Sequence, residues 1–279
     1  MKHICFRFDI DTHVCISKGV PGILDLFSNY GKCTFFVSMG RGFSRQILVK
    51  ESIENIFKKK EFKGGIYSML SKLGVKESLR AILANPLIGL SHSQILHTIN
   101  LQGHELGLHG GKNHAQWEHN ALGWSDDELE SEIKYGLMGF KKLNLPKPVS
   151  FASPCWQSPK KLSTILSSHD FLVMADKHKV FSLPSVDASG IINYPVNIVA
   201  KQPDVGFIEN MRALGFTSSE ILEEFDRQLI EGGNHQVVFD HPLYAGVKEI
   251  ELLSAMLEKC KQRGCKIESI KNTLKYLNF

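Results

Sequence analysis

The sequence lacks the long apolar segments that a membrane-spanning protein needs. None of its runs approaches the roughly 18 consecutive apolar residues of a transmembrane helix. Lys2 is the only early cation, and no long apolar segment follows it, so we expect no secretory signal peptide. Both absences predict a cytoplasmic protein.

Cysteine pairs at metal-binding spacing are missing as well. The cysteines include no C-x-x-C pair and are scattered through segments that are otherwise apolar. We therefore predict reduced thiols, with neither a disulfide framework nor a zinc knuckle. The six residues are Cys5, Cys15, Cys33, Cys155, Cys260 and Cys265.

No stretch that reads as a disordered linker divides the 279 residues, so we expect a single domain over residues 1–279. The chain is 43% hydrophobic and 22% charged, which is typical of a globular protein with a large core. Its positive charge is concentrated in one region. Residues 41–80 contain ten Lys and Arg residues against four Glu residues, an excess of six, whereas the excess over the whole chain is four.

This basic region belongs to a stretch, residues 41–100, that is too long for an ordinary connection between a strand and a helix. Its lysines are interleaved with large apolar residues such as Ile56 and Phe62, so we predict a basic amphipathic helical insertion. Two interpretations stay open: binding of residues 41–80 to an anionic membrane surface, or a solvated helical hairpin. Nucleic acid is not an expected partner, because no nucleic-acid-binding motif accompanies the cations.

Strand-like runs alternate with helical patterns along the rest of the chain. Ser125 and Thr217 each precede a Glu by three residues, which predicts a capping box at the start of a helix. These helices end near Asn144 and at Gly232, and a third is predicted over residues 247–260. The predicted strands cover residues 4–9, 33–38, 105–109, 149–153, 171–174, 193–196, 236–239 and 265–268.

This alternation predicts an α/β protein of parallel units, closed or distorted into a barrel. In such barrels the side chains at the C-terminal ends of the strands meet at one face. Asp9 ends the first predicted strand and Asp11 follows it, His109 ends the third, and His114 lies on the turn after it. Residues two apart on a strand share a face, so both carboxylates can point into one pocket.

One carboxylate and two imidazoles can hold a divalent ion and leave a position open, which is the coordination that a hydrolytic metal site needs. The second carboxylate is then available as a base. A plainer interpretation also stays open, in which the Asp-x-Asp pair caps the turn and the histidines are structural. The presence of both segments at two strand ends favours the metal site.

Several strings together resemble the NodB-type polysaccharide deacetylases, and within that family the ArnD branch, which deformylates an undecaprenyl-phosphate-linked formamido-arabinose on the cytoplasmic membrane face. The resemblance spans most of the chain and implies a distorted (β/α)7-type barrel with a helical insertion. It is carried by FRFDIDT, GVPGILDLFSNYGKCTFFVSMG, GHELGLHGGKNHAQW, GWSDDELESEI, KPVSFASPCW and VVFDHPLYAG.

Position by position, the resemblance implies that Asp9 is the general base and that Asp11, His109 and His114 bind the metal. The family spaces the two histidines four residues apart, whereas here they are five apart, so His114 matches only if the loop has one extra residue. The motif downstream of the loop is in register with that insertion. Strict spacing would instead place Asn113 at the ligand position, which would weaken metal binding.

The resemblance also implies that His241 is the general acid and that Asp176 orients it. Trp156, Gln157 and Trp117 are expected to contact the substrate. The family usually has an arginine, which holds the base, where this chain has Gln157. Because glutamine forms hydrogen bonds but has no charge, three outcomes stay open: a shift of activity in pH, support of the base by another cation, or loss of activity.

The resemblance therefore implies a metal-dependent amide hydrolase that removes an acetyl or formyl group from an amino sugar with one divalent ion, zinc first and manganese or cobalt as alternatives. We expect a polyprenyl-phosphate-linked substrate of cell-surface polysaccharide or lipopolysaccharide biosynthesis, and a protein that is cytoplasmic or peripheral on the inner membrane face. Two alternatives stay open: a deacetylase of a soluble nucleotide sugar or oligosaccharide, and an inactive sugar-binding homologue. The sequence does not predict the oligomeric state.

Overall fold

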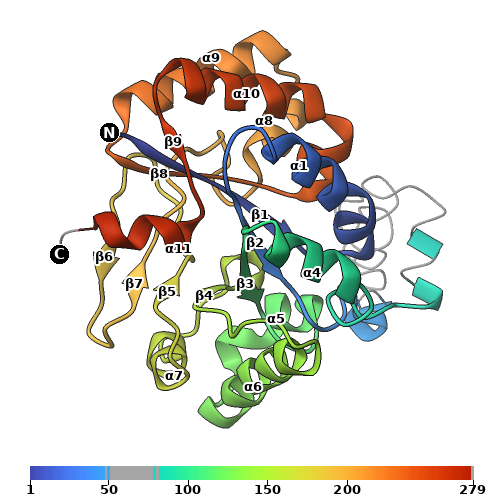
Figure 1. Ribbon diagram of the computed structural model, residues 1–279. Helices are drawn as coiled ribbons and strands as arrows, with labels where there is room; N and C mark the ends of the chain where they lie inside the picture. The colour runs from blue at the N-terminus through green and yellow to red at the C-terminus, as the bar shows by residue number, and fades with distance from the viewer. Residues whose placement is uncertain (48, 51–77, 80–81, 278–279) are drawn as a thin grey trace.

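The computed structural model describes residues 1–47, 49–50, 78–79 and 82–277 (Figure 1). Most of the predicted basic insertion therefore lies outside the described residues, and its contact with a membrane surface stays a prediction.

The described end of the predicted insertion is part of the barrel. Helix α4 (Ser93–Leu101) connects the second strand of the chain to the third. Its Leu96 and Ile99 are buried in the main hydrophobic cluster. This part of the stretch is thus a crossover helix that packs on the sheet.

Nine strands of the described residues form one sheet, in which neighbours follow the order β6-β7-β5-β4-β3-β2-β1-β8 and β9 pairs with β1. The pairs are parallel except for β6 with β7. The strands are β1 (His3–Ile10), β2 (Thr34–Val37), β3 (Glu105–His109), β4 (Ser150–Ala152), β5 (Val173–Met174), β6 (Ser185–Val186), β7 (Ile192–Asn193), β8 (His235–Asp240) and β9 (Lys266–Ile267).

The sheet curls into a distorted barrel (Figure 1). The segment after β7 connects the β5 side of the sheet to β8: Val196 bridges to His178, which follows β5, and Ile198 bridges to Val238 of β8. The predicted α/β class and distorted barrel are confirmed. Each predicted strand overlaps an observed one, whereas β6 is not predicted because it contributes only two exposed residues.

Helices cover the outside of the curled sheet (Figure 1). The capping boxes of Ser125 with Glu128 and of Thr217 with Glu220 are confirmed at α6 and α9. Helix α10 begins at Ile250 because a π-helical turn precedes it. With α4, the helices are α1 (Val20–Phe27), α5 (His114–Asn120), α6 (Asp126–Lys142), α7 (Leu162–Ser168), α8 (Phe207–Ala213), α9 (Ser218–Glu231), α10 (Ile250–Gln262) and α11 (Ile270–Thr273).

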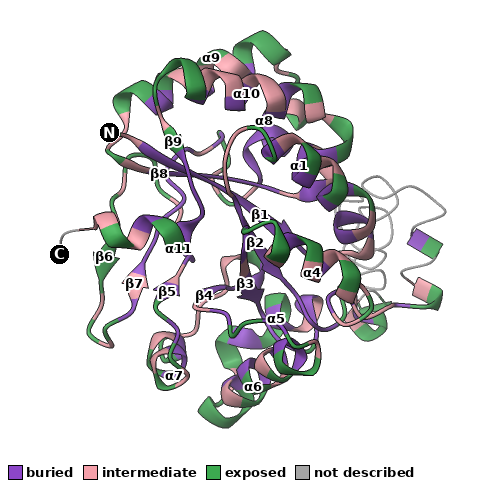
Figure 2. Ribbon diagram, in the orientation of Figure 1, coloured by how far each residue is buried: buried purple, intermediate pink, exposed green. Residues whose placement is uncertain are grey.

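Strand β1 is buried along its whole length and lies between two apolar clusters (Figure 2). Successive side chains of a strand point to opposite faces. Phe6 and Phe8 belong to the larger cluster, between sheet and helices, and Cys5 belongs to the smaller one inside the barrel. Arg7 and Asp9 share the face of Cys5, so the barrel interior contains two buried charged groups.

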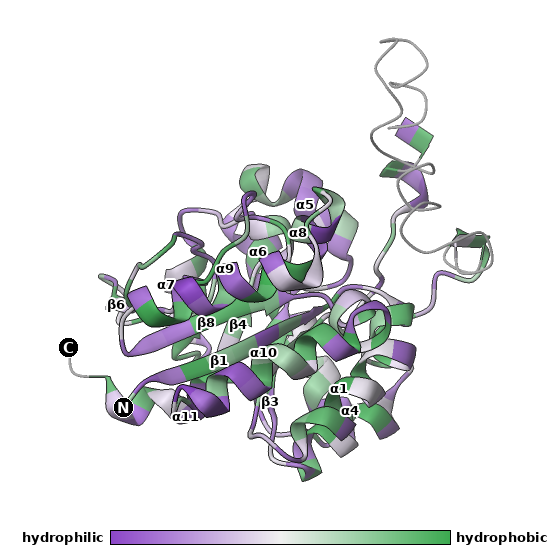
Figure 3. Ribbon diagram, turned by 90° about the horizontal axis from the view of Figure 1, so that it is seen from above, coloured by the Kyte–Doolittle hydropathy of each residue, from purple (hydrophilic) through white to green (hydrophobic). Residues whose placement is uncertain are grey.

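The helices of the described residues are amphipathic, with hydrophilic and hydrophobic residues alternating along those that cover the sheet (Figure 3). Among the described residues, no helix is both long enough and apolar enough to cross a membrane.

Candidate active site

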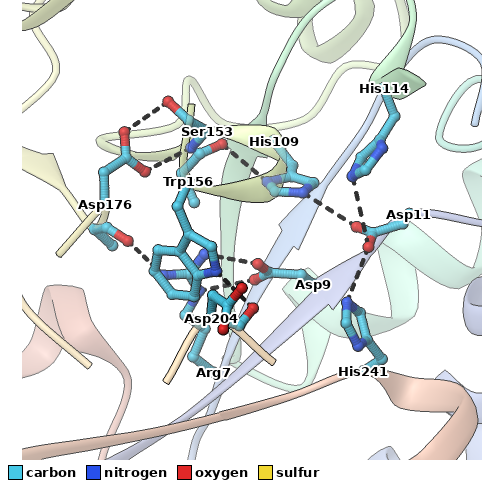
Figure 4. A network of polar contacts seen from close by, with 12 residues as sticks. Arg7, Asp9, Asp11, His109, His114, Ser153, Trp156, Asp176, Asp204 and His241 are labelled. Atoms are coloured by element: carbon cyan, nitrogen blue, oxygen red, sulfur yellow. Dashed lines mark hydrogen bonds and ion pairs between the residues drawn. The ribbon is translucent and has the colours of Figure 1, made fainter. Parts of the chain in front are cut away.

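Polar side chains gather at the C-terminal ends of three parallel strands. Asp9 lies near the end of β1 and Asp11 directly follows it, His109 ends β3, and His241 follows β8. Parallel strands present these ends at one face of a barrel. The structure brings the four side chains together there, as the sequence predicts (Figure 4).

Asp11 is surrounded by imidazoles (Figure 4). Its Oδ1 lies 3.1 Å from His109 Nε2, and its Oδ2 lies 3.6 Å from His114 Nε2. The same Oδ2 lies 3.0 Å from His241 Nε2. The ligand atoms of Asp11, His109 and His114 all lie within 4.8 Å of one another. These are the three residues that the sequence analysis predicts as metal ligands.

The hydrogen bonds of this group fit a divalent ion. His109 Nδ1 donates to the Ala152 carbonyl at 2.9 Å, which leaves the lone pair on Nε2, the nitrogen that faces Asp11. Asp11 Oδ1 is buried without a hydrogen-bond partner. Burial lowers the pKa of His114 and so favours the neutral imidazole that a metal ligand requires. A carboxylate and two imidazoles suit zinc, manganese or cobalt.

The structure distinguishes the two alignments of the His109 loop. Asn113 is the N-cap of α5: its Oδ1 accepts from the Gln116 N–H at 3.0 Å, and its Nδ2 donates to the Phe43 carbonyl at 2.9 Å. Both polar groups of Asn113 are therefore engaged in the fold. His114, the first residue of α5, supplies the imidazole that lies beside Asp11 and His109, which agrees with the alignment that has one extra loop residue.

Asp9 is held by a cation from its own strand. Arg7 Nε donates to Asp9 Oδ1 at 2.8 Å, and Arg7 Nη2 donates to Oδ2 at 2.6 Å, so the pair is bidentate (Figure 4). Of the three outcomes that Gln157 left open, the structure therefore fits the one in which another cation supports the base. The Gln157 side chain instead donates to the Cys155 carbonyl at 3.2 Å.

Aromatic rings enclose the Arg7 guanidinium. Its central carbon lies 4.9 Å from the centroid of Phe36, 4.5 Å from that of Trp156 and 5.1 Å from that of Phe239. Arg7 Nη1 also donates to the Ala175 carbonyl. Cation–π contacts and a bidentate carboxylate thus compensate for the burial of this charge. The ring of Trp156 covers Arg7, and its expected contact with the substrate stays a prediction.

The carboxylate that orients His241 is Glu209, which corrects the expectation for Asp176. His241 Nδ1 donates to Glu209 Oε2 at 2.7 Å. Burial favours the neutral imidazole, but the charges of Glu209 and Asp11 outweigh it and raise the pKa of His241 well above its ordinary value.

Asp176 organises a different part of the site. Its Oδ1 accepts from the Ser153 N–H at 2.6 Å, and its Oδ2 accepts from the Ser153 hydroxyl at 2.6 Å and from the Ser158 hydroxyl. In Figure 4 Asp176 lies beside Ser153, whereas His241 lies beside Asp11. Asp176 follows β5, next to β4 in the sheet, so it holds the loop after β4.

Helix α8 brings Glu209 to His241. Asp240 Oδ2 accepts from the Ile208 N–H at 2.6 Å, in the first turn of α8. Gly206 precedes this turn, and a Cβ at its position would lie 2.6 Å from Asp240 Oδ1. Burial raises the pKa of Asp240 to about 7. The end of β8 thus fixes both His241 and the helix that carries its partner.

Trp117 is wholly buried, which corrects the expectation that it contacts the substrate. Its ring packs against Trp124 and Phe151, with centroid distances of 5.4 Å and 5.5 Å. Its Nε1 donates to the Gln157 carbonyl at 2.9 Å. Trp117 therefore joins α5 to the loop after β4.

A pocket of about 410 Å³ lies beside the start of α5, the helix that carries His114. Asn113, the residue before His114, lines it together with Gln116 of α5. Arg41 and Arg45, at the start of the predicted insertion, also line it. The pocket therefore has two cations in its lining, and one of its lining residues is the sequence neighbour of His114.

The sequence analysis does not predict two residues of the site, Arg7 and Glu209. Arg7 had a usable signal, because it lies two residues before Asp9 on a strand whose other residues are mostly apolar, so both share one face. Glu209 had none, since it lies 32 residues before His241 on an unremarkable segment.

Comparison with solved structures shows that the chain shares its fold with several enzymes, carbohydrate deacetylases among them. No known family profile matches the sequence. A protein assigned as a polysaccharide deacetylase from Mycobacterium smegmatis has 16% identity and a TM-score of 0.65, over 98% of this chain and 89% of that chain. A family 4 carbohydrate esterase from Streptomyces lividans, in complex with acetate, has 9% identity and a TM-score of 0.54, over 95% of this chain and 91% of that one.

A family 4 pseudoenzyme from Bacillus anthracis also has this fold, with 14% identity and a TM-score of 0.53, over 97% of this chain and 64% of that chain. The chain thus has the NodB-type distorted barrel fold. Since active and inactive proteins share it, the function has to be argued from the site.

Proposed function

We propose that this protein is a metal-dependent amide hydrolase that removes an N-acyl group from an amino sugar. The observation that carries this proposal is the grouping of Asp11, His109 and His114 within 4.8 Å, beside a separate carboxylate, Asp9, and a separate imidazole, His241. Ligands, base and acid are thus different residues at one strand-end face, and a purely structural role would not require all of them.

Asp11, His109 and His114 would hold one divalent ion, which as a Lewis acid would activate water and polarise the acyl carbonyl. The remaining steps belong to side chains of this chain. Asp9 would accept the proton of the attacking water, and the bidentate contact with Arg7 keeps its carboxylate in one orientation.

His241 would donate the proton that the departing amine needs. Its Nδ1–H is engaged by Glu209, so Nε2, which lies 3.0 Å from Asp11 Oδ2, is the nitrogen left to deliver a proton. Its raised pKa favours the protonated form, which a general acid must have before the C–N bond breaks. An amine is a poor leaving group unless it is protonated, so this transfer is a required step.

The direct test measures release of acetate or formate from N-acetyl and N-formyl amino sugars, together with metal content. We expect Asp9→Asn and His241→Ala to abolish turnover while each keeps about one divalent ion per chain, and Asp11→Ala to lose the ion. His169→Ala is the matched control, because His169 pairs with Glu130 away from the site. Retained turnover in Asp9→Asn would exclude Asp9 as the base.

We further propose that the sugar is linked to a polyprenyl phosphate, as in the ArnD branch, and that it is processed at a membrane surface. The pocket that Arg41 and Arg45 line, together with Asn113 next to His114, supports binding of an anionic group. The excess of six positive charges over residues 41–80 supports attraction to anionic lipid.

Substrate preference and vesicle binding together test this finer proposal. Faster turnover of the lipid-linked sugar and sedimentation with vesicles containing anionic phospholipid are expected. A soluble nucleotide sugar or oligosaccharide as the preferred substrate, without vesicle binding, would overturn it. A chain that binds no ion after incubation with zinc, manganese or cobalt would instead be an inactive sugar-binding homologue.

A further inference from the structure

A second group of metal-binding side chains lies against the first. The ligand atoms of His114, Glu118 and Cys155 lie within 4.8 Å of one another. Glu118 and Cys155 are exposed, so an ion could reach them from solvent. The hydrolytic chemistry uses neither residue. A thiol distinguishes this group from that of Asp11.

Two neighbouring elements build the group. His114 and Glu118 are four residues apart on α5, so their side chains lie on the same face of that helix. Cys155 comes from the tight turn Pro154–Trp156 that follows β4. The hydrogen bond from Trp117 Nε1 to the Gln157 carbonyl, 2.9 Å long, joins the helix to the segment after this turn. The fold therefore holds the ligands near one another before any ion binds.

The chemistry of the three ligands selects the ion. Imidazole nitrogen, carboxylate oxygen and thiolate sulfur form a typical donor set for zinc, whereas calcium and magnesium prefer oxygen ligands alone. Soft sulfur also favours zinc over harder divalent ions. Cys155 would coordinate as the thiolate, and its proton would pass to solvent when the ion binds.

We propose that His114, Glu118 and Cys155 bind a thiophilic divalent ion such as zinc at the outer edge of the candidate active site. This site goes beyond the proposed hydrolase function, because its carboxylate and its thiol have no part in that reaction. His114 belongs to both groups, so the two sites are linked through one imidazole.

Cobalt(II) titration of the full chain tests the proposal, because a thiolate bound to cobalt gives a sulfur-to-metal charge-transfer absorption in the near ultraviolet. The Asp11 group has no sulfur ligand, so this absorption reports the second site alone. We expect the band in the wild type and also in Asp11→Asn, in which the hydrolytic site is disabled. We expect its loss in Cys155→Ser.

Two further variants separate a three-ligand site from a cysteine that binds cobalt alone. Glu118→Gln should raise the cobalt concentration at half-saturation by at least about tenfold, since even groups outside the ligand shell change metal affinity by that factor. Cys265→Ser is the matched control and should leave the band unchanged, because Cys265 is only partly exposed and lies outside the group.

Three results would overturn the proposal: no charge-transfer band in the wild type, a band that survives Cys155→Ser, or equal cobalt affinity in Glu118→Gln and wild type. Absence of hydrolase activity alongside the band and its loss in Cys155→Ser would instead overturn the proposed function and leave this site in place. Because Glu118 and Cys155 are exposed, both variants are expected to fold, which circular dichroism and thermal unfolding would check.

Discussion

The two aspartates of the first motif lie two residues apart, yet the surroundings of Asp9 and of Asp11 differ in kind (Figure 4). Asp9 is paired with a guanidinium that three aromatic rings enclose. Asp11 instead faces three imidazoles, one of which is tied to a second carboxylate.

The difference teaches that the role of each carboxylate depends on its neighbours. A permanently charged arginine occupies both Asp9 oxygens, so that Asp9 is held in one orientation. Imidazoles have lone pairs and titrate near neutrality, so the Asp11 side can hold an ion and move a proton. The following changes break or sharpen this contrast, from the largest expected effect to the smallest.

Removing the cation from the Asp9 side should have the largest effect. Arg7→Met leaves the buried Asp9 carboxylate without its partner, so we expect the free energy of unfolding to fall by about 3–5 kcal/mol. Urea denaturation measures it. The double variant Arg7→Met/Asp9→Asn should be less destabilised than Arg7→Met alone, because no unpaired charge remains. Equal losses would mean that packing in the aromatic cage, not charge pairing, determines the stability.

Removing the carboxylate of Glu209, which binds His241 beside Asp11, should affect turnover more than folding. Without the charge of Glu209, the pKa of His241 falls, so the protonated acid persists only to a lower pH. For Glu209→Gln we expect kcat to fall by about 10²-fold and the alkaline limb of the kcat profile to move to lower pH, with metal content unchanged. An unshifted limb would contradict the assignment. Glu224→Gln on α9 is the control.

His104, which has no carboxylate partner, sharpens the contrast with the histidines around Asp11. Burial, aided by the charge of Lys32, lowers the pKa of His104 from 6.5 to about 4, and its Nδ1 accepts from the Cys33 N–H. Between these two pH values the folded state therefore binds fewer protons than the unfolded state. The contribution of neutral His104 to the free energy of unfolding is fully present above about pH 6.5 and is lost as the pH falls toward 4.

The expected loss is about 2–3 kcal/mol, and urea denaturation at pH 7.5 and 4.5 measures it as the difference between wild type and His104→Asn. In that variant this part of the pH dependence should disappear. An identical pH dependence in both proteins would show that other groups account for the acid sensitivity.

The smallest effect concerns the helix that carries Glu209. In Gly206→Ala the new methyl group meets the Asp240 carboxylate, so α8 has to shift. We expect a loss of about 1 kcal/mol in the free energy of unfolding and a modest fall in kcat. Gly123→Ala is the matched control, because a Cβ there meets nothing within 4 Å. Unchanged kcat in Gly206→Ala would show that the position of Glu209 tolerates this shift.

The sequence by itself determined the parts that depend on local pattern. The capping boxes at Ser125 and Thr217 and the apolar runs are properties of neighbouring residues, so helix starts and strands follow from them. Parallel strands align their ends, which is why Asp11, His109 and His114 could be predicted as one group before their contacts were known.

Only the tertiary structure decided which partners those residues have. His241 pairs with Glu209 and not with Asp176 because of where α8 lies against the end of β8. The burial of Trp117 depends on how α5 packs over β4. These contacts join residues 32 and 40 positions apart along the chain. No local pattern encodes such distances, because they depend on how whole elements pack together.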